Sequence, residues 1–153
     1  MKTPLRRAHL YLAENRPAII AASHFNSSGV YFEQDGPLVC ELAKDGPLAG
    51  FLRTALSQFS FRDVNLRDHK KTDWPSYKAS QCRSVREFER EYLLIGVSAV
   101  NEAELFYDAC CQPHGEDDVK LHVTFNRSAS ADEIDRQLNK LFNACLRWDA
   151  SGF

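Results

Sequence analysis

The sequence lacks the short motifs by which many enzymes are recognised. It contains no glycine-rich phosphate loop, no Gly-x-Ser-x-Gly elbow and no His-Glu-x-x-His pair. These motifs mark phosphate-binding proteins, serine hydrolases and zinc proteases, respectively. We therefore expect no catalytic site, no cofactor and no bound metal, and we predict a protein that acts by binding.

The number of cysteines is odd. None of the 5 cysteines forms a Cys-x-x-Cys pair, which favours reduced thiols in a cytoplasm. Metal-capable side chains lie close together at Cys110, Cys111, His114 and Glu116. A strand through the two cysteines would place them on opposite faces, so at most one joins His114, and we expect no zinc site.

Long apolar runs are also missing. No stretch approaches the roughly 18 apolar residues of a membrane span, and Glu14-Asn15-Arg16 interrupts the N-terminal region, so we expect no signal peptide. The hydrophobic fraction of 44% and the charged fraction of 26% are typical of globular proteins. The length of 153 residues fits one domain with a substantial core. We predict a single α+β domain over residues 1–153.

Neither sign of charge is in large excess. The formal net charge is −2, from 19 Lys and Arg against 21 Asp and Glu. Residues 1–83 carry 12 basic and 8 acidic side chains, or +4, whereas residues 84–153 carry 7 and 13, or −6. A solvated surface explains such an asymmetry, and so does a surface that meets a basic partner.

The clearest structural signal lies in the C-terminal half. Apolar and polar side chains alternate over Val119–Phe125, which predicts a strand with one apolar face. Ser130-Ala-Asp-Glu133 then has the pattern of a capping box, which begins a helix. The apolar stripe of that helix consists of Ile134, Leu138, Leu141, Phe142 and Cys145. A one-sided helix and a one-sided sheet pack on each other.

The elements before that strand follow the same logic. Ser84-Val-Arg-Glu87 repeats the capping-box pattern and predicts a short helix. Tyr92–Val97 then predicts a strand, and a middle strand over Leu105–Cys111 would have Leu105, Tyr107, Ala109 and Cys111 facing the helix.

The N-terminal half contains further strand signals. Leu5–Ala13 fits a strand or a helix equally well, and Ala18–Phe25 fits a buried strand. Val30–Glu33 and Leu38–Leu42 flank Asp35-Gly36, which predicts a hairpin with its turn at that dipeptide.

A helix follows these strands. Asp45 fits its N-cap and Pro47 its first turn. Its inward stripe would be Leu48, Phe51, Leu52, Ala55, Leu56 and Phe59. The chain thus has strands followed by a helix twice. We predict an α+β fold: a mainly antiparallel sheet of β-meanders covered on one side by amphipathic helices. A repeated β-β-β-α unit and a coincidence of order both explain the pattern.

Residues 61–83 form the least regular segment. Aromatic residues are interleaved there with six basic ones: Arg62, Arg67, Lys70, Lys71, Lys78 and Arg83. Such a loop, with a histidine, is enough for a small RNA-processing or other hydrolytic enzyme, which is our alternative hypothesis. The histidines are scattered, at His9, His24, His69, His114 and His122. The sequence pI of 6.2 argues against direct nucleic-acid binding.

The candidate binding surface is acidic. Residues of even number on the middle strand would form an outer face in which an aromatic ring lies among carboxylates. The predicted interface comprises Glu102, Glu104, Phe106, Asp108, Glu116, Asp117 and Asp118. Interfaces depend on a few desolvated anchors surrounded by charge, and this set has that composition.

Several short segments resemble immunity proteins of bacterial contact-dependent growth inhibition systems. They are Trp74-Pro-Ser-Tyr77, Ser84-Val-Arg-Glu-Phe88, the terminal helix with Leu138 and Leu141, and the segment Asp45–Phe59 with Leu48 and Leu56. The resemblance implies a cytoplasmic, non-enzymatic protein that neutralises a cognate C-terminal toxin domain by blocking its active site or substrate surface. The toxins of that family are frequently nucleases, so a basic protein partner is expected. A small-molecule-binding α+β domain is a third hypothesis.

Overall fold

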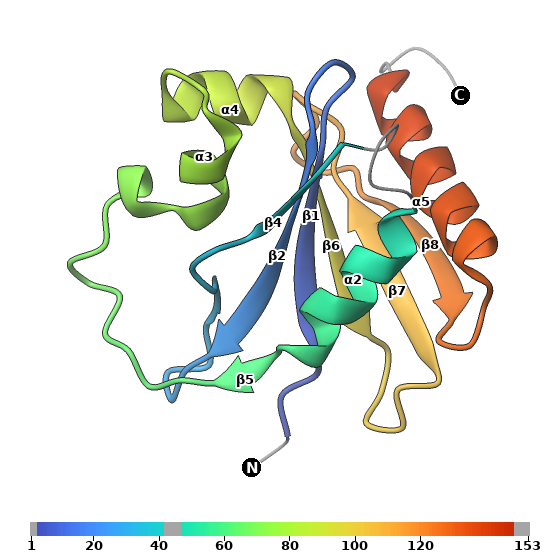
Figure 1. The fold of residues 1–153 in the computed structure, drawn as a ribbon, viewed down its shortest axis with the longest axis horizontal. Helices are drawn as coiled ribbons and strands as arrows, with labels where there is room; N and C mark the ends of the chain where they lie inside the picture. The colour runs from blue at the N-terminus through green and yellow to red at the C-terminus, as the bar shows by residue number, and fades with distance from the viewer. Residues whose placement is uncertain (1–2, 42–46, 149–153) are drawn as a thin grey trace.

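An eight-stranded sheet forms the centre of the protein. The computed structural model describes residues 3–41 and 47–148. Within them the main strand order is β3-β2-β1-β6-β7-β8, and β4 and β5 also pair with β2 (Figure 1). All neighbouring strands are antiparallel except β2 and β5. The strands are β1 Arg7–Leu12, β2 Ala18–Phe25, β3 Tyr31–Glu33, β4 Leu38–Cys40, β5 Ser60–Phe61, β6 Leu93–Ala99, β7 Phe106–Cys111 and β8 Leu121–Asn126.

Two long helices cover one face of this sheet, which we call the helix face. They are α2 (Leu48–Ser57), which crosses in front of the strands in Figure 1, and α5 (Ala131–Leu146), which stands beside β8. The main core lies beneath them and includes Leu10 and Ile20 from the central strands. The predicted stripe of α5 is confirmed in full, since its five residues are all buried. The stripe predicted for α2 is confirmed at Leu48, Leu52, Ala55 and Leu56, whereas Phe51 is only partly buried. Phe59 is also partly buried and lies beyond the end of the helix.

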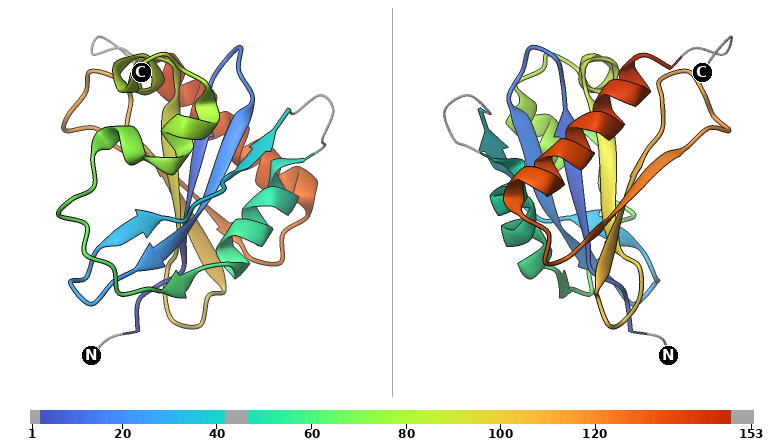
Figure 2. Two further views of the ribbon diagram at one scale, coloured as in Figure 1. Left: turned by 60° about the vertical axis from the view of Figure 1, so that its left-hand side comes forward. Right: turned by 90° about the vertical axis from the view of Figure 1, so that its right-hand side faces the viewer.

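The opposite face, the open face, is covered at one end only. Two short helices, α3 (Pro75–Ser80) and α4 (Val85–Glu91), pack there, beside the 3-10 turn Lys71–Asp73 (Figure 2, left). Tyr11 and Ile19 are each adjacent in sequence to a core residue, Leu10 and Ile20 respectively, and point the other way. They join a second apolar cluster with Phe88. The α+β fold is confirmed, and α3 and α4 add a partial second layer to it.

The structure corrects the predicted hairpin at Asp35-Gly36. β3 and β4 do not pair with each other, since both pair with β2. Between these pairings residues 34–37 lie opposite only two residues of β2, and Gly36 has a φ of +70°. The dipeptide therefore forms a bulge within one long edge strand. A bulge and a tight turn need the same residue types, because both require positive φ.

The predicted meander of the C-terminal half is confirmed. β6, β7 and β8 pair in order, with Val97 opposite Ala109 and Ala109 opposite Val123. Leu105 is a correction, since it precedes β7 and is 59% exposed instead of facing the helix. Ser84 and Ser130 cap α4 and α5 as predicted, each accepting a hydrogen bond from the backbone amide three residues later.

Helix α5 provides the cap for helix α2. The carboxylate of Asp135 accepts hydrogen bonds from the first two amides of α2, at 3.0 Å from Leu48 N and 2.8 Å from Ala49 N. Pro47, the N-cap residue, makes no side-chain cap. The predicted cap, Asp45, lies outside the described residues. No helix in residues 3–41 and 47–148 is long and apolar enough to span a membrane.

We expect Asp135→Ala to lower the free energy of unfolding by about 0.5–2 kcal/mol, the usual cost of losing an N-cap. The reason is that two amides at the start of α2 lose their acceptor. Urea denaturation measures the change. Asp118→Ala, which removes an exposed carboxylate from a loop, serves as the control. Equal effects of the two substitutions would contradict a capping role for Asp135.

Candidate functional site

A row of polar side chains crosses the open face, one from each strand in turn. The register places Ser23 opposite Glu33, and Arg7, Ser98, Asp108 and Thr124 opposite one another in sequence. Since Ala8 pairs with Ala22, Arg7 continues the row to Ser23. The helix face is apolar at the same level of the sheet, so the two faces differ completely in chemistry.

The structure brings together only part of the predicted interface. Phe106 and Asp108 lie on the open face as expected, and Phe106 is 43% exposed. Val100, just after the adjoining strand β6, is an exposed apolar neighbour of Phe106, whereas the exposed Leu94 lies near the other end of β6. Pockets on this face are lined by Phe106 and Asp108, and in part by Asp117.

Glu102 and Glu104 lie in the loop before β7 and not on the strand. Glu104 has a φ of +54°, which turns its carboxylate toward Arg6, with 3.0 Å between Oε1 and Nε. Glu102 lines a small pocket with the N-terminal segment Thr3–Leu5.

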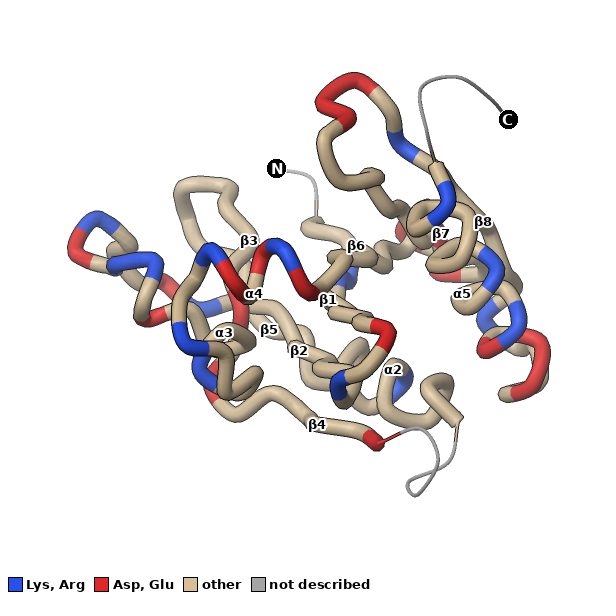
Figure 3. Tube along the Cα trace, turned by 90° about the horizontal axis from the view of Figure 1, so that it is seen from above, with Lys and Arg blue, Asp and Glu red and all other residues tan. Residues whose placement is uncertain are grey.

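Glu116, Asp117 and Asp118 lie at the other end of the sheet, in the connection between β7 and β8 (Figure 3). A six-residue strand, about 20 Å long, separates them from the Glu102–Glu104 loop. The seven predicted residues therefore form three groups, and of them only Phe106 and Asp108 lie on strand β7 itself.

A polar hub anchors α3 to the open face, and sequence reasoning missed it. The carboxylate of Glu33 is 5% exposed. It accepts hydrogen bonds from the Tyr11 hydroxyl, from Trp74 Nε1 at 2.9 Å, and from Ser76 through its amide at 3.1 Å and its hydroxyl at 2.7 Å. The sequence contains only a weak signal for this hub, because a glutamate at the end of a predicted strand normally faces solvent.

The hub perturbs the ionisation of its members. Burial by itself raises the pKa of Glu33, but hydrogen bonds from His9, Tyr11, Trp74 and Ser76 outweigh it and leave that pKa below its ordinary value. Burial and the negative charge of Glu33 raise the pKa of Tyr11 above its ordinary value. Tyr11 therefore remains a hydrogen-bond donor and Glu33 an ionised acceptor at neutral pH.

A groove of about 610 Å³ adjoins the hub. Residues from the predicted irregular segment form one wall, and the sheet forms the other. The cationic and histidine side chains of the lining are His9, His24, Arg62, His69, Lys70 and Lys78. Asp35 and Asp73 also line the groove. Three of the five scattered histidines are thus brought together with the basic segment, as the hydrolase hypothesis requires.

Three polar side chains of the open face form a second constellation. His122 Nδ1 lies 3.0 Å from Asp108 Oδ2, and its Nε2 lies 3.7 Å from Cys110 Sγ. Cysteine, imidazole and carboxylate in this order resemble the arrangement of nucleophile, base and orienting group in thiol hydrolases. Burial is the main cause of a raised pKa at Cys110, so its thiol is mainly protonated at neutral pH.

Arg7 occupies the middle of the open face without a carboxylate partner among the described residues. Its guanidinium lies over the ring of Tyr31, 5.4 Å from the centroid, and next to Gly96, whose missing side chain leaves room for it. Its Nε is buried without a hydrogen bond, as is Ser23 Oγ within the same described ranges. His9 Nδ1 lies 3.4 Å from Glu33 Oε1.

Metal-capable side chains do not gather elsewhere in the described part of the chain. No group of three or more His, Cys, Asp or Glu side chains there is arranged to hold a metal ion. His114 and Cys110 both line the largest pocket of the open face, whereas Cys111 is buried on the helix face near Cys145.

Comparison with known proteins finds similarity only in structure. No family model and no curated protein matches the sequence. A protein of unknown function from Neisseria meningitidis, NMB0488, matches with a TM-score of 0.68 and 16% identity over 95% of this chain and 99% of that chain. A chain of the CdiA-CT/CdiI toxin and immunity complex from Yersinia pseudotuberculosis matches with a TM-score of 0.65 and 11% identity, over 94% and 98%. The chain shares their fold.

We expect Glu33→Gln to lower the free energy of unfolding at pH 7 by about 1–3 kcal/mol, because buried donors lose a charged acceptor. The folded-state pKa of Glu33 is depressed, so its contribution is present above the ordinary value of 4.5 and is lost as the pH falls through the folded value. The difference from the parent chain should therefore shrink in acid. Urea denaturation at several pH values measures it, with the exposed Glu89→Gln as control. A deficit independent of pH would contradict the assignment.

Proposed function

We propose that this protein is a non-catalytic immunity protein that binds and neutralises a protein toxin domain. One observation supports this most: the chain has the fold of a chain from a toxin and immunity complex over almost the full length of both. The short segments that resemble contact-dependent growth inhibition immunity proteins point to the same role. All five cysteines are free thiols, in keeping with a cytoplasmic location.

The open face is the surface that we propose for the toxin. It combines the exposed apolar side chains Val100 and Phe106 with the charged groups Arg7 and Asp108 on the neighbouring positions of the sheet. An apolar centre with charges beside it is the usual composition of an affinity-determining patch. Since the open face presents Asp108 and is bordered at its other end by the acidic β7–β8 connection, a basic toxin such as a nuclease would be complementary to it.

Binding to a candidate toxin domain taken from a neighbouring gene tests the proposal. Biolayer interferometry with the purified toxin domain should give a saturable complex, and co-expression should protect cells from the toxin. We expect Phe106→Ala to speed dissociation about tenfold, because anchors act mainly on the off-rate. Asp108→Lys should slow association and weaken its dependence on salt.

Lys140→Glu, an exposed change on the far side of α5, is the control and should leave the kinetics unchanged. Absence of both binding and protection would refute the immunity role. If Phe106→Ala and Asp108→Lys both bound the toxin as tightly as the parent chain, the immunity role would stand, but the interface would have to lie on another surface.

A hydrolase is the second candidate, favoured by the contact of Cys110 with His122 and of His122 with Asp108. We expect no turnover of nitrophenyl esters or RNA above buffer at pH 7, because the raised pKa of Cys110 leaves little thiolate. Absorbance and gel assays measure this. Turnover that disappears in Cys110→Ser and His122→Ala would make the hydrolase the leading hypothesis.

A further inference from the structure

A separate pocket opens on the helix face, away from the proposed toxin surface. It has a volume of about 360 Å³ and lies between α2, α5 and the ends of β7 and β8. Its floor is apolar and belongs to the main core: Leu52, Leu56, Phe125 and Ile134, all at most 5% exposed. A cavity of this size with an apolar floor and a few polar groups has the usual character of a small-ligand site.

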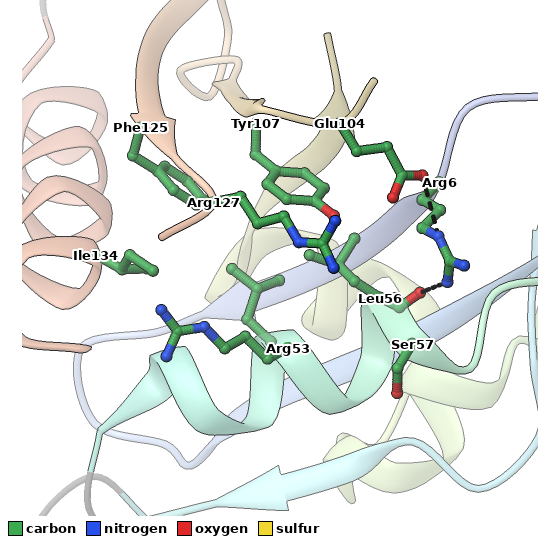
Figure 4. A pocket seen from close by; sticks show the side chains of 10 residues that line it. Arg6, Arg53, Leu56, Ser57, Glu104, Tyr107, Phe125, Arg127 and Ile134 are labelled. Atoms are coloured by element: carbon green, nitrogen blue, oxygen red, sulfur yellow. Dashed lines mark hydrogen bonds and ion pairs between the residues drawn. The ribbon is translucent and has the colours of Figure 1, made fainter. Parts of the chain in front are cut away.

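Three arginines surround the pocket (Figure 4). Arg6 donates through Nη1 to the carbonyl of Leu56 at 3.0 Å, at the end of α2. Arg53 donates through Nη2 to the carbonyl of Ala129 at 2.6 Å, in the turn before α5. These backbone contacts hold two guanidinium groups in place before any ligand arrives, which lowers the entropic cost of binding.

The third arginine is available to a ligand. Within the described residues, the guanidinium of Arg127 makes no hydrogen bond or ion pair. It lies next to the hydroxyl of Tyr107 in Figure 4. Burial, followed by the charge of Glu104, raises the pKa of Tyr107, while Arg127 and Arg6 lower it, so both guanidinium groups act on this hydroxyl. Tyr107 is therefore a protonated donor beside an unpaired cation.

The ion pair between Glu104 and Arg6 shows that an arginine of this pocket pairs with a carboxylate. Its carboxylate lies 3.0 Å from Arg6 Nε and is the one acidic group of the lining. Three positive charges against one negative leave the pocket with a formal charge of +2. A planar guanidinium pairs with carboxylate and phosphate oxygens alike. The pocket thus contains one carboxylate of its own, and its remaining net positive charge favours a second oxyanion from a ligand.

We propose that this pocket binds a small organic anion, with its carboxylate or phosphate on Arg127, Arg53 and Tyr107 and its apolar body on the Leu52–Phe125 floor. Glu104 competes for Arg6 and repels the ligand. Removal of Glu104 should therefore strengthen binding and removal of Arg127 should weaken it. Opposite effects from two neighbouring residues would not arise from general destabilisation of the fold.

Isothermal titration of the full chain tests the proposal with four probes: 3-phenylpropionate, phenyl phosphate, inorganic phosphate and the neutral 3-phenylpropanol. We expect one saturable site for at least one aromatic anion, with affinity at least about tenfold above that of the alcohol, as expected for a charge-assisted contact. The stronger of phenylpropionate and phenyl phosphate identifies the oxyanion. Binding of inorganic phosphate alone at equal strength would overturn the role of the floor.

Three variants complete the test. Arg127→Gln should weaken binding about tenfold, Glu104→Gln should strengthen it severalfold, and Arg67→Gln, an exposed arginine far from the pocket, should leave it unchanged. Equal binding of the alcohol, no saturable binding, or equal losses for Arg127→Gln and Arg67→Gln would each overturn the proposal. Since no toxin is used, the result is independent of the immunity role.

Discussion

Burial of one face of the central sheet is the constraint on which the other features depend. β1 and β6 lie side by side in the middle, and their inward side chains, such as Leu10 and Ile95, are completely buried. Covering this face requires two helices, because the sheet is wider than one helix can cover. α2 and α5 must therefore lie together, and the Asp135 carboxylate holds the start of α2 against α5. The helix-face pocket lies where this cover ends.

The open face is free of that constraint over most of its area. α3 and α4 cover one end, held by the hydrogen bonds of Trp74 and Ser76 to Glu33. Polar side chains cross the remainder in register, with Arg7 in the middle. Residual apolar side chains, Phe106 among them, stay exposed. An apolar and charged surface on a rigid sheet suits a protein partner, whereas the enclosed pocket of the helix face suits a small ligand.

The two faces thus support separate proposals. Glu104 links them in sequence, since it stands two residues before Phe106, yet its left-handed backbone turns it toward Arg6 and away from the open face. An interface predicted from alternation alone assigns Glu104 and Phe106 to one surface. The change of direction just before the start of β7 instead assigns them to different sites.

The sequence by itself determined the elements whose signal is local. The stripe of α5, the caps at Ser84 and Ser130 and the alternation of β8 each depend on spacing within one segment, so they were predictable. Only the tertiary structure decided the contacts between distant segments. Both β3 and β4 pair with β2, and Asp135 caps a helix 86 residues away. His122 meets Asp108 and Cys110 only through the register of β7 and β8. Such contacts depend on which strands become neighbours, and strand pairing is decided by burial of the whole sheet rather than by any single segment.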